Sequence, residues 1–172
     1  MSLNLAVGDP LPSVGLRATD GYLLNLRSFV TKQPAQILFF GAPSLTGATR
    51  RRGMKAIEAL ARGYQQLREA GIAVVGVSCD SVEQQAEFAA QHKLPYLLLS
   101  DERRGAVEVV GIPTVADGAN VNVVQPVALA VDRDGTVRAI IERVDPETLV
   151  DQAITALSEP IPAAAEDAAT GS

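Results

Sequence analysis

The sequence contains no tryptophan, and it has a single cysteine, Cys79, and a single histidine, His92, among 172 residues. One cysteine excludes a disulfide within the chain and a zinc site built from cysteines, and one histidine excludes a metal site built on a histidine pair. Three tyrosines and four phenylalanines are too few to predict base stacking or an aromatic belt at a membrane. No apolar run approaches the ~20 residues of a membrane span. The sequence therefore predicts no metal site, no nucleic-acid partner and no membrane segment.

Positive charge is also scarce, since 15 basic residues stand against 20 acidic ones and the formal net charge is -5. This balance disfavours a polyanionic partner. The N-terminal residues lack the basic and apolar blocks of a signal peptide, so we expect a cytoplasmic protein. No P-loop, dinucleotide fingerprint or metal motif is present, so no cofactor is expected. The length suits one domain with a sizeable core.

What the chain does contain is an alternation of strand and helix patterns. Continuous apolar runs bounded by Gly, Pro or polar residues predict buried strands, and apolar residues at helical spacing predict helices. The predicted strands are 35–42, 72–79 and 95–101, the predicted helices are 54–71, 80–94, 102–112 and 145–158, and the predicted hairpins lie within 7–29 and 126–144. The remaining segment, 113–125, is expected to be a loop or an excursion from the main fold.

Short polar signals set the expected boundaries. Asp80 with Glu83 three residues later is typical of a helix N-cap with a capping box, and Asp145 before a proline is typical of a helix start. Asp-Gly pairs at 20–21 and 134–135 predict hairpin turns. The DRDG segment around the second pair is too short for a calcium loop, and we interpret it as a turn.

In this order the elements predict an α/β fold of the thioredoxin-like type. It would have three layers, α/β/α, with a mixed central sheet and an N-terminal hairpin. The domain is expected to span residues 1–157. Residues 158–172 are small, acidic and rich in Pro and Ala, a composition that predicts a disordered tail.

Four segments carry a resemblance to a known family. They are "VGDPLPSVGLRATDG", "GIAVVGVSCDSVEQQAEFAAQHKLPYLLLSD", "VEVVGI" and "LAVDRDGTVRAII", in that order along the chain. Together they cover roughly residues 5 to 157 and resemble the peroxiredoxins, in particular the alkyl hydroperoxide reductase / thiol-specific antioxidant family in its bacterioferritin-comigratory-protein branch. The resemblance implies a peroxiredoxin-type thioredoxin fold. It also implies an antioxidant oxidoreductase, in which a cysteine thiolate attacks peroxide and becomes a sulfenic acid.

The family's reactive loop reads Pro-x-x-x-Thr-x-x-Cys and is completed by a distant Arg, because a helix N-terminus and a guanidinium hold the thiolate. The corresponding segment here is "APSLTGAT". The resemblance places Pro43 at the family's Pro with a shorter spacing, Leu45 at its Thr, Ala48 at its Cys and Pro126 at its Arg. Whether this chain is an enzyme stays open, since the family reduces peroxides but its cysteine position holds alanine.

The leading interpretation is a peroxiredoxin-like protein that has lost thiol peroxidase activity and acts as a binding, scaffolding or regulatory module. Its contact surface would be the loop at 43–52, where a protein partner or a small anion could meet free N–H groups of the following helix. The residues expected to bind are Thr46, Gly47, Thr49, Arg50, Arg51 and Arg52. An ordinary solvated arginine cluster and a homodimer remain open alternatives.

The alternative function is an atypical one-cysteine thiol peroxidase or redox sensor that uses Cys79. A strand end ahead of a helix favours its thiolate, whereas burial and the neighbouring aspartate favour an inert structural cysteine. Thioredoxin-type disulfide exchange is excluded at the loop because residues 45–48 include no cysteine, although Pro126 stands where thioredoxins carry a cis proline. Arg133 and Arg138 are alternative sources of a guanidinium near the pocket.

Overall fold

The computed structural model describes residues 3–32, 35–41 and 47–158. The strands are β1 (Gly15–Ala18), β2 (Leu23–Asn25), β3 (Ala35–Gly41), β4 (Ile72–Ser78), β5 (Leu97–Ser100), β6 (Thr114–Asp117), β7 (Asn120–Val124), β8 (Val127–Val131) and β9 (Val137–Ile141). The helices are α1 (Leu26–Thr31), α2 (Ala48–Arg62), α3 (Tyr64–Glu69), α4 (Val82–His92), α5 (Gly105–Val110) and α6 (Leu149–Ser158).

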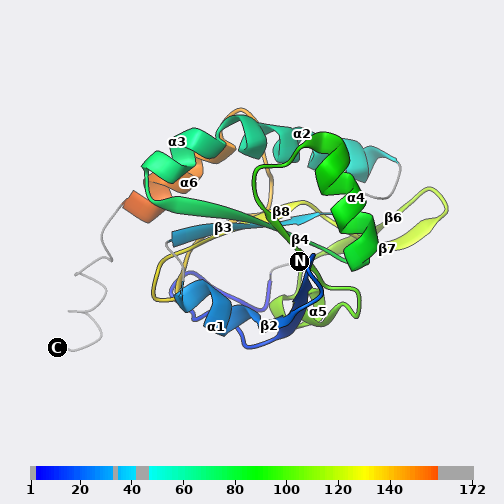
Figure 1. Ribbon diagram of the computed structural model, residues 1–172, viewed down its shortest axis with the longest axis horizontal. Helices are drawn as coiled ribbons and strands as arrows, with labels where there is room; N and C mark the ends of the chain where they lie inside the picture. The colour runs from blue at the N-terminus through cyan, green and yellow to red at the C-terminus, as the bar shows by residue number, and fades with distance from the viewer. Residues whose placement is uncertain (1–2, 33–34, 42–46, 159–172) are drawn as a thin grey trace.

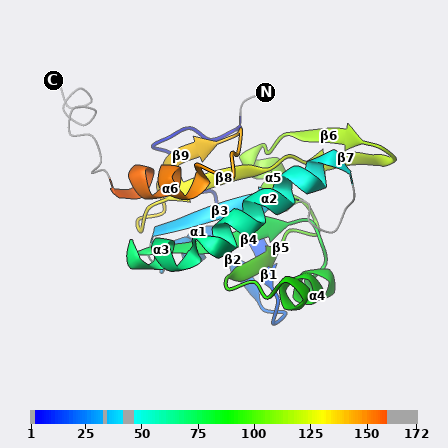
Figure 2. The same cartoon turned by 90° about the horizontal axis from the view of Figure 1, so that it is seen from above.

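Seven strands form one mixed sheet in the order β2-β1-β5-β4-β3-β8-β9, and β6 and β7 form a separate hairpin. The central strands β3, β4 and β5 are parallel, and the outer pairs are antiparallel. Helices α2, α3, α4 and α6 cover one face of the sheet, while α1 and α5 lie on the other (Figures 1 and 2). The predicted layered α/β architecture with a mixed sheet and an N-terminal hairpin is therefore confirmed.

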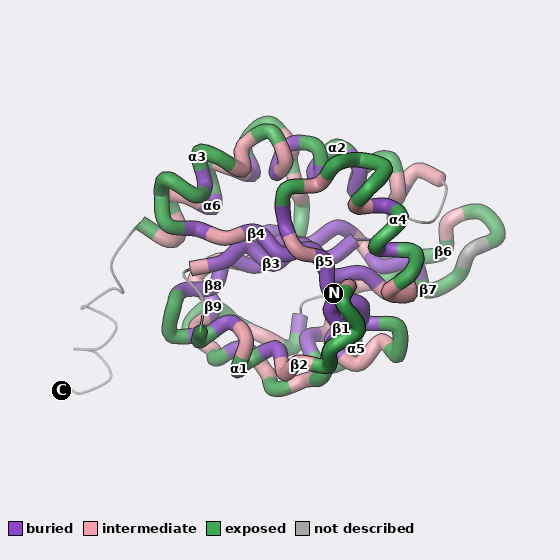
Figure 3. Tube along the Cα trace, viewed as in Figure 1, coloured by how far each residue is buried: buried purple, intermediate pink, exposed green. Residues whose placement is uncertain are grey.

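The central strands are apolar on both faces because each face is covered by helices. In β3, Ile37 and Phe39 pack in the cluster that contains the α2 and α6 side chains, and Leu38 and Phe40 pack in the cluster that contains α1 and α5. Figure 3 shows the buried strands as a continuous band between more exposed helices. A strand buried on both faces reads as an unbroken apolar run, which is why the sequence predicts these strands well.

Strand direction decides which loops meet at one end of the sheet. Gly41 at the end of β3 pairs with Ser78 at the end of the parallel β4. Phe40 pairs with Val127 at the start of the antiparallel β8. The start of α2, Cys79 and Pro126 therefore adjoin the same sheet edge.

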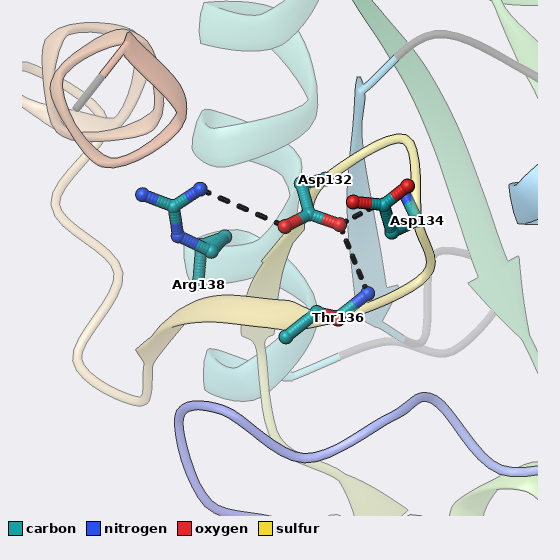
Figure 4. Close-up of polar contacts among 4 residues, drawn as sticks. All are labelled: Asp132, Asp134, Thr136 and Arg138. Atoms are coloured by element: carbon teal, nitrogen blue, oxygen red, sulfur yellow. Dashed lines mark hydrogen bonds and ion pairs between the residues drawn. The ribbon is translucent and has the colours of Figure 1, made fainter. Parts of the chain in front are cut away.

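The β8–β9 turn lies at the opposite end of the sheet. The Asp132 carboxylate accepts hydrogen bonds from the backbone N–H groups of Asp134 and Thr136, and its other oxygen lies 3.6 Å from Nη1 of Arg138 (Figure 4). The interpretation of DRDG as a turn is confirmed. Because Val131 pairs with Gln36 at the start of β3, neither Arg133 nor Arg138 lies at the edge that carries Pro126.

The predicted helix at 54–71 is wrong at its start and in its continuity. α2 begins at Ala48, and Gly63 separates it from α3. A Cβ on Gly63 would lie 2.6 Å from Cγ2 of Val150, so the glycine lets α6 approach closely. Neither the packing of α6 nor the partner that caps the start of α2 is visible in the local sequence.

Other boundaries also differ from the prediction. The N-cap of α4 is Ser81, not Asp80, and Gln84 completes the capping box one residue later than expected. The segment expected to be a loop or an excursion at 113–125 is an excursion, the β6–β7 hairpin, whose strands were not predicted. Asp145 accepts a hydrogen bond from the N–H of Glu147 at 2.9 Å, in the turn that leads into α6.

The described helices include none long and apolar enough to cross a membrane. Within the described ranges, no group of three or more His, Cys, Asp or Glu side chains could hold a metal ion. The predicted tail, apart from Ser158 at the end of α6, lies outside the described residues.

Candidate functional site

The first turn of α2 is capped by a carboxylate from a distant part of the chain. The N–H of Thr49 donates a hydrogen bond to Oδ2 of Asp117 at 2.8 Å. Asp117 is the last residue of β6, so the contact joins the β6–β7 hairpin to the helix. The hydrogen bond from the backbone N–H of Thr49 is the main cause that holds the pKa of Asp117 below its usual range. A hydrogen bond from the Thr49 side chain and the charge of Arg52 act in the same direction. The helix N-terminus therefore already holds an anion.

Gly47, immediately before α2, leaves the space that the Asp117 carboxylate occupies. Its φ is 108°, a conformation that favours glycine, and it precedes the helix as the N-cap residue without a side-chain hydrogen bond. A Cβ at this position would lie 2.7 Å from Oδ1 of Asp117. Both the backbone conformation and the space permit only glycine here without a shift of the hairpin.

The three arginines of the first helical turns do not share one environment. Arg50 is half-buried, while Arg51 and Arg52 are exposed. Nη2 of Arg52 donates to Oγ1 of Thr49 at 3.3 Å. The expectation of free N–H groups for an external anion is wrong for Thr49, because the Asp117 carboxylate already accepts from its N–H. The remaining candidate Thr46 lies outside the described residues.

The positions that correspond to the family's reactive residues are described in part. Pro43 and Leu45 lie outside the described residues, whereas Ala48 is the first residue of α2. Pro126 is buried, and its Cγ lies 3.8 Å from where a Cβ on Gly53 would be, so its ring faces α2. The described peptide bonds include no cis bond, so Pro126 does not reproduce the cis proline of thioredoxins.

A groove of about 510 Å³ lies beside this helix. Arg52 and Lys55 of α2 line one side, and the segment 142–146 between β9 and α6 lines the other, with Pro126 also in the lining. Two of the three cations of the groove, Lys55 and Arg143, were not predicted from the sequence. Lys55 follows Arg52 by three residues, so helical spacing would have placed them on one face, but no local signal links Arg143 to α2.

Asp117 was also not predicted as a site residue from the sequence. The Asp117-Gly118 pair is itself a hairpin signal, and Gly118 has a φ of 65° as such a turn requires. The pair could have predicted the β6–β7 hairpin. It could not have predicted that the hairpin carboxylate reaches α2, since the contact spans 68 positions in sequence.

Cys79, the one thiol of the chain, lies directly after β4 and is half-buried. It packs against the core cluster that contains α1 and α5, whereas the apolar side chains of α2 belong to the cluster on the other face. Burial raises the pKa of Cys79 to about 11; Arg104 opposes this shift, and Asp101 and Asp80 add to it. The thiol is therefore neutral at pH 7 and packs on the sheet face opposite to the one that the apolar side chains of α2 cover.

Asp101, whose charge acts on the thiol, caps the start of α5. Its two carboxylate oxygens accept hydrogen bonds from the N–H groups of Ala106 at 3.0 Å and Val107 at 2.9 Å. Burial raises the pKa of Asp101, and these hydrogen bonds together with Arg104 oppose that shift. The Asp101 carboxylate therefore holds the start of α5, and its charge raises the pKa of Cys79 instead of activating the thiol.

Solved structures show which class of fold this is. The crystal structure of peroxidoxin BcpB from Mycobacterium tuberculosis matches with a TM-score of 0.74 and 24% identity, over 90% of this chain and 97% of that chain. Peroxiredoxin Q from Xanthomonas campestris matches with a TM-score of 0.69 and 19% identity, over 92% of this chain and 98% of that chain. The chain has the thioredoxin-like fold of the peroxiredoxins.

The family follows from the sequence comparisons. The model of the AhpC/TSA family matches residues 7–140, and the chain belongs to this family. Chloroplastic peroxiredoxin Q of Suaeda salsa is 30% identical over 148 residues, which are 86% of this chain and 65% of that protein. A putative peroxiredoxin bcp of Coxiella burnetii is 25% identical over 141 residues, 80% of this chain and 89% of that protein. This chain spans 46% to 65% of the length of the chloroplastic relatives.

Proposed function

We propose that this member of the AhpC/TSA family is not a thiol peroxidase but a binding module built on the peroxiredoxin fold. The observation that carries the proposal is the first turn of α2, where Ala48 offers no nucleophile and the Asp117 carboxylate accepts a hydrogen bond from the Thr49 N–H. The family's chemistry needs a thiolate at this helix N-terminus, and here another anion is bound there.

The electrostatics of the turn support this reading. A helix N-terminus stabilises one nearby negative charge through its free N–H groups and its dipole, and the effect falls off within the first turn. A second anion beside the first meets like-charge repulsion, which disfavours its ionised form. With Asp117 ionised at this turn, a thiolate or an incoming hydroperoxide anion is disfavoured at Ala48.

The remaining thiol does not replace the lost one. Cys79 has a pKa of about 11, and only the thiolate is an efficient nucleophile toward peroxide. Its position on the face away from α2 also separates it from the groove that Arg52 and Lys55 line. A one-cysteine mechanism through Cys79 would lack an activated thiol, since Arg104 opposes the rise in the pKa of Cys79 but does not cancel it.

The test is hydrogen peroxide consumption by the purified chain with dithiothreitol, next to Cys79→Ser and a protein-free blank. We expect all three rates to agree, since neither position 48 nor position 79 supplies a reactive thiolate. Turnover that exceeds the blank would contradict the proposal. If that turnover vanished in Cys79→Ser, the peroxidase chemistry would lie at Cys79 instead.

A further inference from the structure

We propose that the groove between α2 and the β9–α6 connection binds a small organic monocarboxylate, with its carboxylate at Arg52, Lys55 and Arg143 and its apolar part on the floor of the groove. This inference rests on the proposed function and names the kind of ligand that such a binding module would take. It is carried by the charges, the lining and the size of the groove.

Three cations converge on the groove from two elements. Arg52 and Lys55 are three residues apart on α2 and therefore lie on one side of that helix. Arg143 comes from the connection after β9, across the groove. Within the described ranges, no acidic side chain lies within ion-pair distance of any of the three. Arg52 also donates to Thr49 and acts on the Asp117 carboxylate, so Lys55 and Arg143 offer a ligand the more available charges, although the protein as a whole carries a net charge of -5.

The acidic residues of the lining limit the charge of that ligand. Glu142 and Asp145 also line the groove, so its charged side chains sum to one net positive charge. The Asp145 carboxylate is already used as an acceptor for the Glu147 N–H at 2.9 Å. A monoanion therefore matches the groove better than a phosphate dianion does. The planar fork of a guanidinium also fits a carboxylate with two parallel hydrogen bonds.

The floor of the groove is apolar. Pro126 is buried, Pro146 is half-buried, and Val144 packs against the core cluster beneath α2 and α6. A volume of about 510 Å³ lies within the ~300–1,000 Å³ of small-molecule sites. An inorganic anion would leave this floor uncovered, whereas an aliphatic chain on a carboxylate would use both the floor and the cations.

The position of Pro126 explains why the floor can be apolar. The family resemblance places a guanidinium there, and this chain has a buried proline whose ring faces Gly53 of α2. The cations of this groove are instead the exposed side chains at its rim, Arg52, Lys55 and Arg143. A site with charge at its rim and proline at its floor suits an amphipathic anion and not a small polar peroxide.

The experiment uses octanoate as the probe. Backbone amide chemical shifts of the ¹⁵N-labelled chain are followed in low salt as octanoate is added up to ~2 mM, with octan-1-ol and inorganic phosphate as comparison probes. We expect shifts at Gln125, Val144 and Asp145 that saturate with a Kd below about 1 mM. We expect octan-1-ol and phosphate to bind at least about fivefold more weakly, since each lacks one of the two features.

Two variants locate the carboxylate. Arg143→Gln should weaken octanoate binding by about tenfold or more, because it removes one charge-assisted hydrogen-bonding fork. Arg62→Gln should leave binding unchanged, because Arg62 is exposed on the same helix and does not line the groove. Unchanged amide spectra of the free variants show that each is folded.

Three results would overturn the inference: no saturable shift with octanoate, equal binding of octan-1-ol, or octanoate affinity that Arg143→Gln leaves unchanged. These outcomes are distinct from failure of the proposed function, which peroxide consumption measures. A silent peroxide assay without octanoate binding would refute the ligand alone. Peroxide turnover together with octanoate binding would refute the proposed function and keep the groove as an anion site.

Discussion

At the scale of single residues, the Thr49 N–H and the Asp117 carboxylate make a contact that no local pattern encodes. A helix N-cap is normally supplied by the residue that precedes the helix. Here that residue is Gly47, which has no side chain, and the cap comes from a hairpin. The glycine and the aspartate depend on each other, because a Cβ on Gly47 would occupy the space of the carboxylate.

Cys79 gives a residue-scale prediction about pH. With a pKa of about 11, roughly one thiol in a thousand is ionised at pH 8. Alkylation by iodoacetamide should therefore be slow at pH 8 and rise about tenfold for each pH unit up to pH 10. Mass spectrometry of chain alkylated at a series of pH values measures the rate, and the urea-unfolded chain serves as the control, with a midpoint near ~8.5.

The same shift has a consequence for stability. The pKa of Cys79 is raised in the folded chain, so the neutral thiol is favoured by folding. The contribution of this neutral thiol to the stability of the fold is complete below the pKa that Cys79 has in the unfolded chain. It is lost as the pH rises toward 11. The alkylation prediction fails if the rate for the folded chain levels off near pH 8 to 9, because the thiol would then be ionised at an ordinary pH.

At the scale of elements, two glycines of the α2 region have opposite roles. Gly63 ends α2 where α6 packs, and an added Cβ would lie 2.6 Å from Cγ2 of Val150. Gly53 lies inside α2, and the nearest described atom to an added Cβ is Cγ of Pro126 at 3.8 Å. The first position has no room for a methyl group and the second has room.

We therefore expect opposite effects from the same substitution. Gly63→Ala should destabilise the chain by about 1–3 kcal/mol, because Val150 and α6 must shift. Gly53→Ala should stabilise it by about 0.5–1 kcal/mol, because alanine lowers the conformational entropy of the unfolded chain and favours the helix. Urea unfolding measures both. Equal changes in the two variants would show that helix propensity, and not the packing of α6, dominates at these positions.

The sequence predicted the elements whose signals are local and missed those that depend on distant contacts. The buried strands β3 and β4 follow from their apolar runs, and the β8–β9 turn follows from its Asp-Gly pair. The start of α2 was placed six residues too late, because it has a glycine N-cap and a partner on another hairpin. At α4 the prediction was one residue early, since Asp80 and Ser81 are both good N-caps and only the hydrogen bonds distinguish them.

At the scale of the whole molecule, strand direction places the candidate site. Parallel β3 and β4 end together, and β8 begins beside them, so the edge that carries Ala48 and Pro126 could be predicted from the order of the elements. The face of the sheet on which Cys79 packs could not be predicted, because it depends on which residues of β4 point toward α2. Cys79 lies at the predicted edge but packs on the opposite face, with α1 and α5.

The groove, too, could not be predicted from the sequence. Its cations come from α2 and from the connection after β9, segments about 90 positions apart that only the folded sheet brings together. The arginine run at 50–52 was visible in the sequence, yet the groove is lined by Arg52 and not by Arg51. Which arginine faces the groove depends on the phase of the helix. The sequence leaves that phase open because it does not show where α2 begins.

The anion at the start of α2 leads to a final prediction, made in a Cys79→Ser background so that only a new thiol is present. Ala48→Cys returns a thiol to the helix N-terminus, where Asp117 still accepts the Thr49 hydrogen bond. We expect its alkylation by iodoacetamide at pH 7 to be slow. Adding Asp117→Asn should speed it at least about fivefold, because removal of the competing charge lowers the pKa of the new thiol.

The matched control is Ala48→Cys with Glu58→Gln, which removes an exposed negative charge from the same helix at a distance from its N-terminus. This control should leave the alkylation rate unchanged, because the effect of a helix N-terminus on a charge falls off within the first turn. Equal acceleration by both changes would mean that net charge, not the capping carboxylate, sets the reactivity of the turn. No acceleration by Asp117→Asn would mean that the capping carboxylate does not set the pKa of a thiol at this turn, and the electrostatic basis of the proposed function would be wrong.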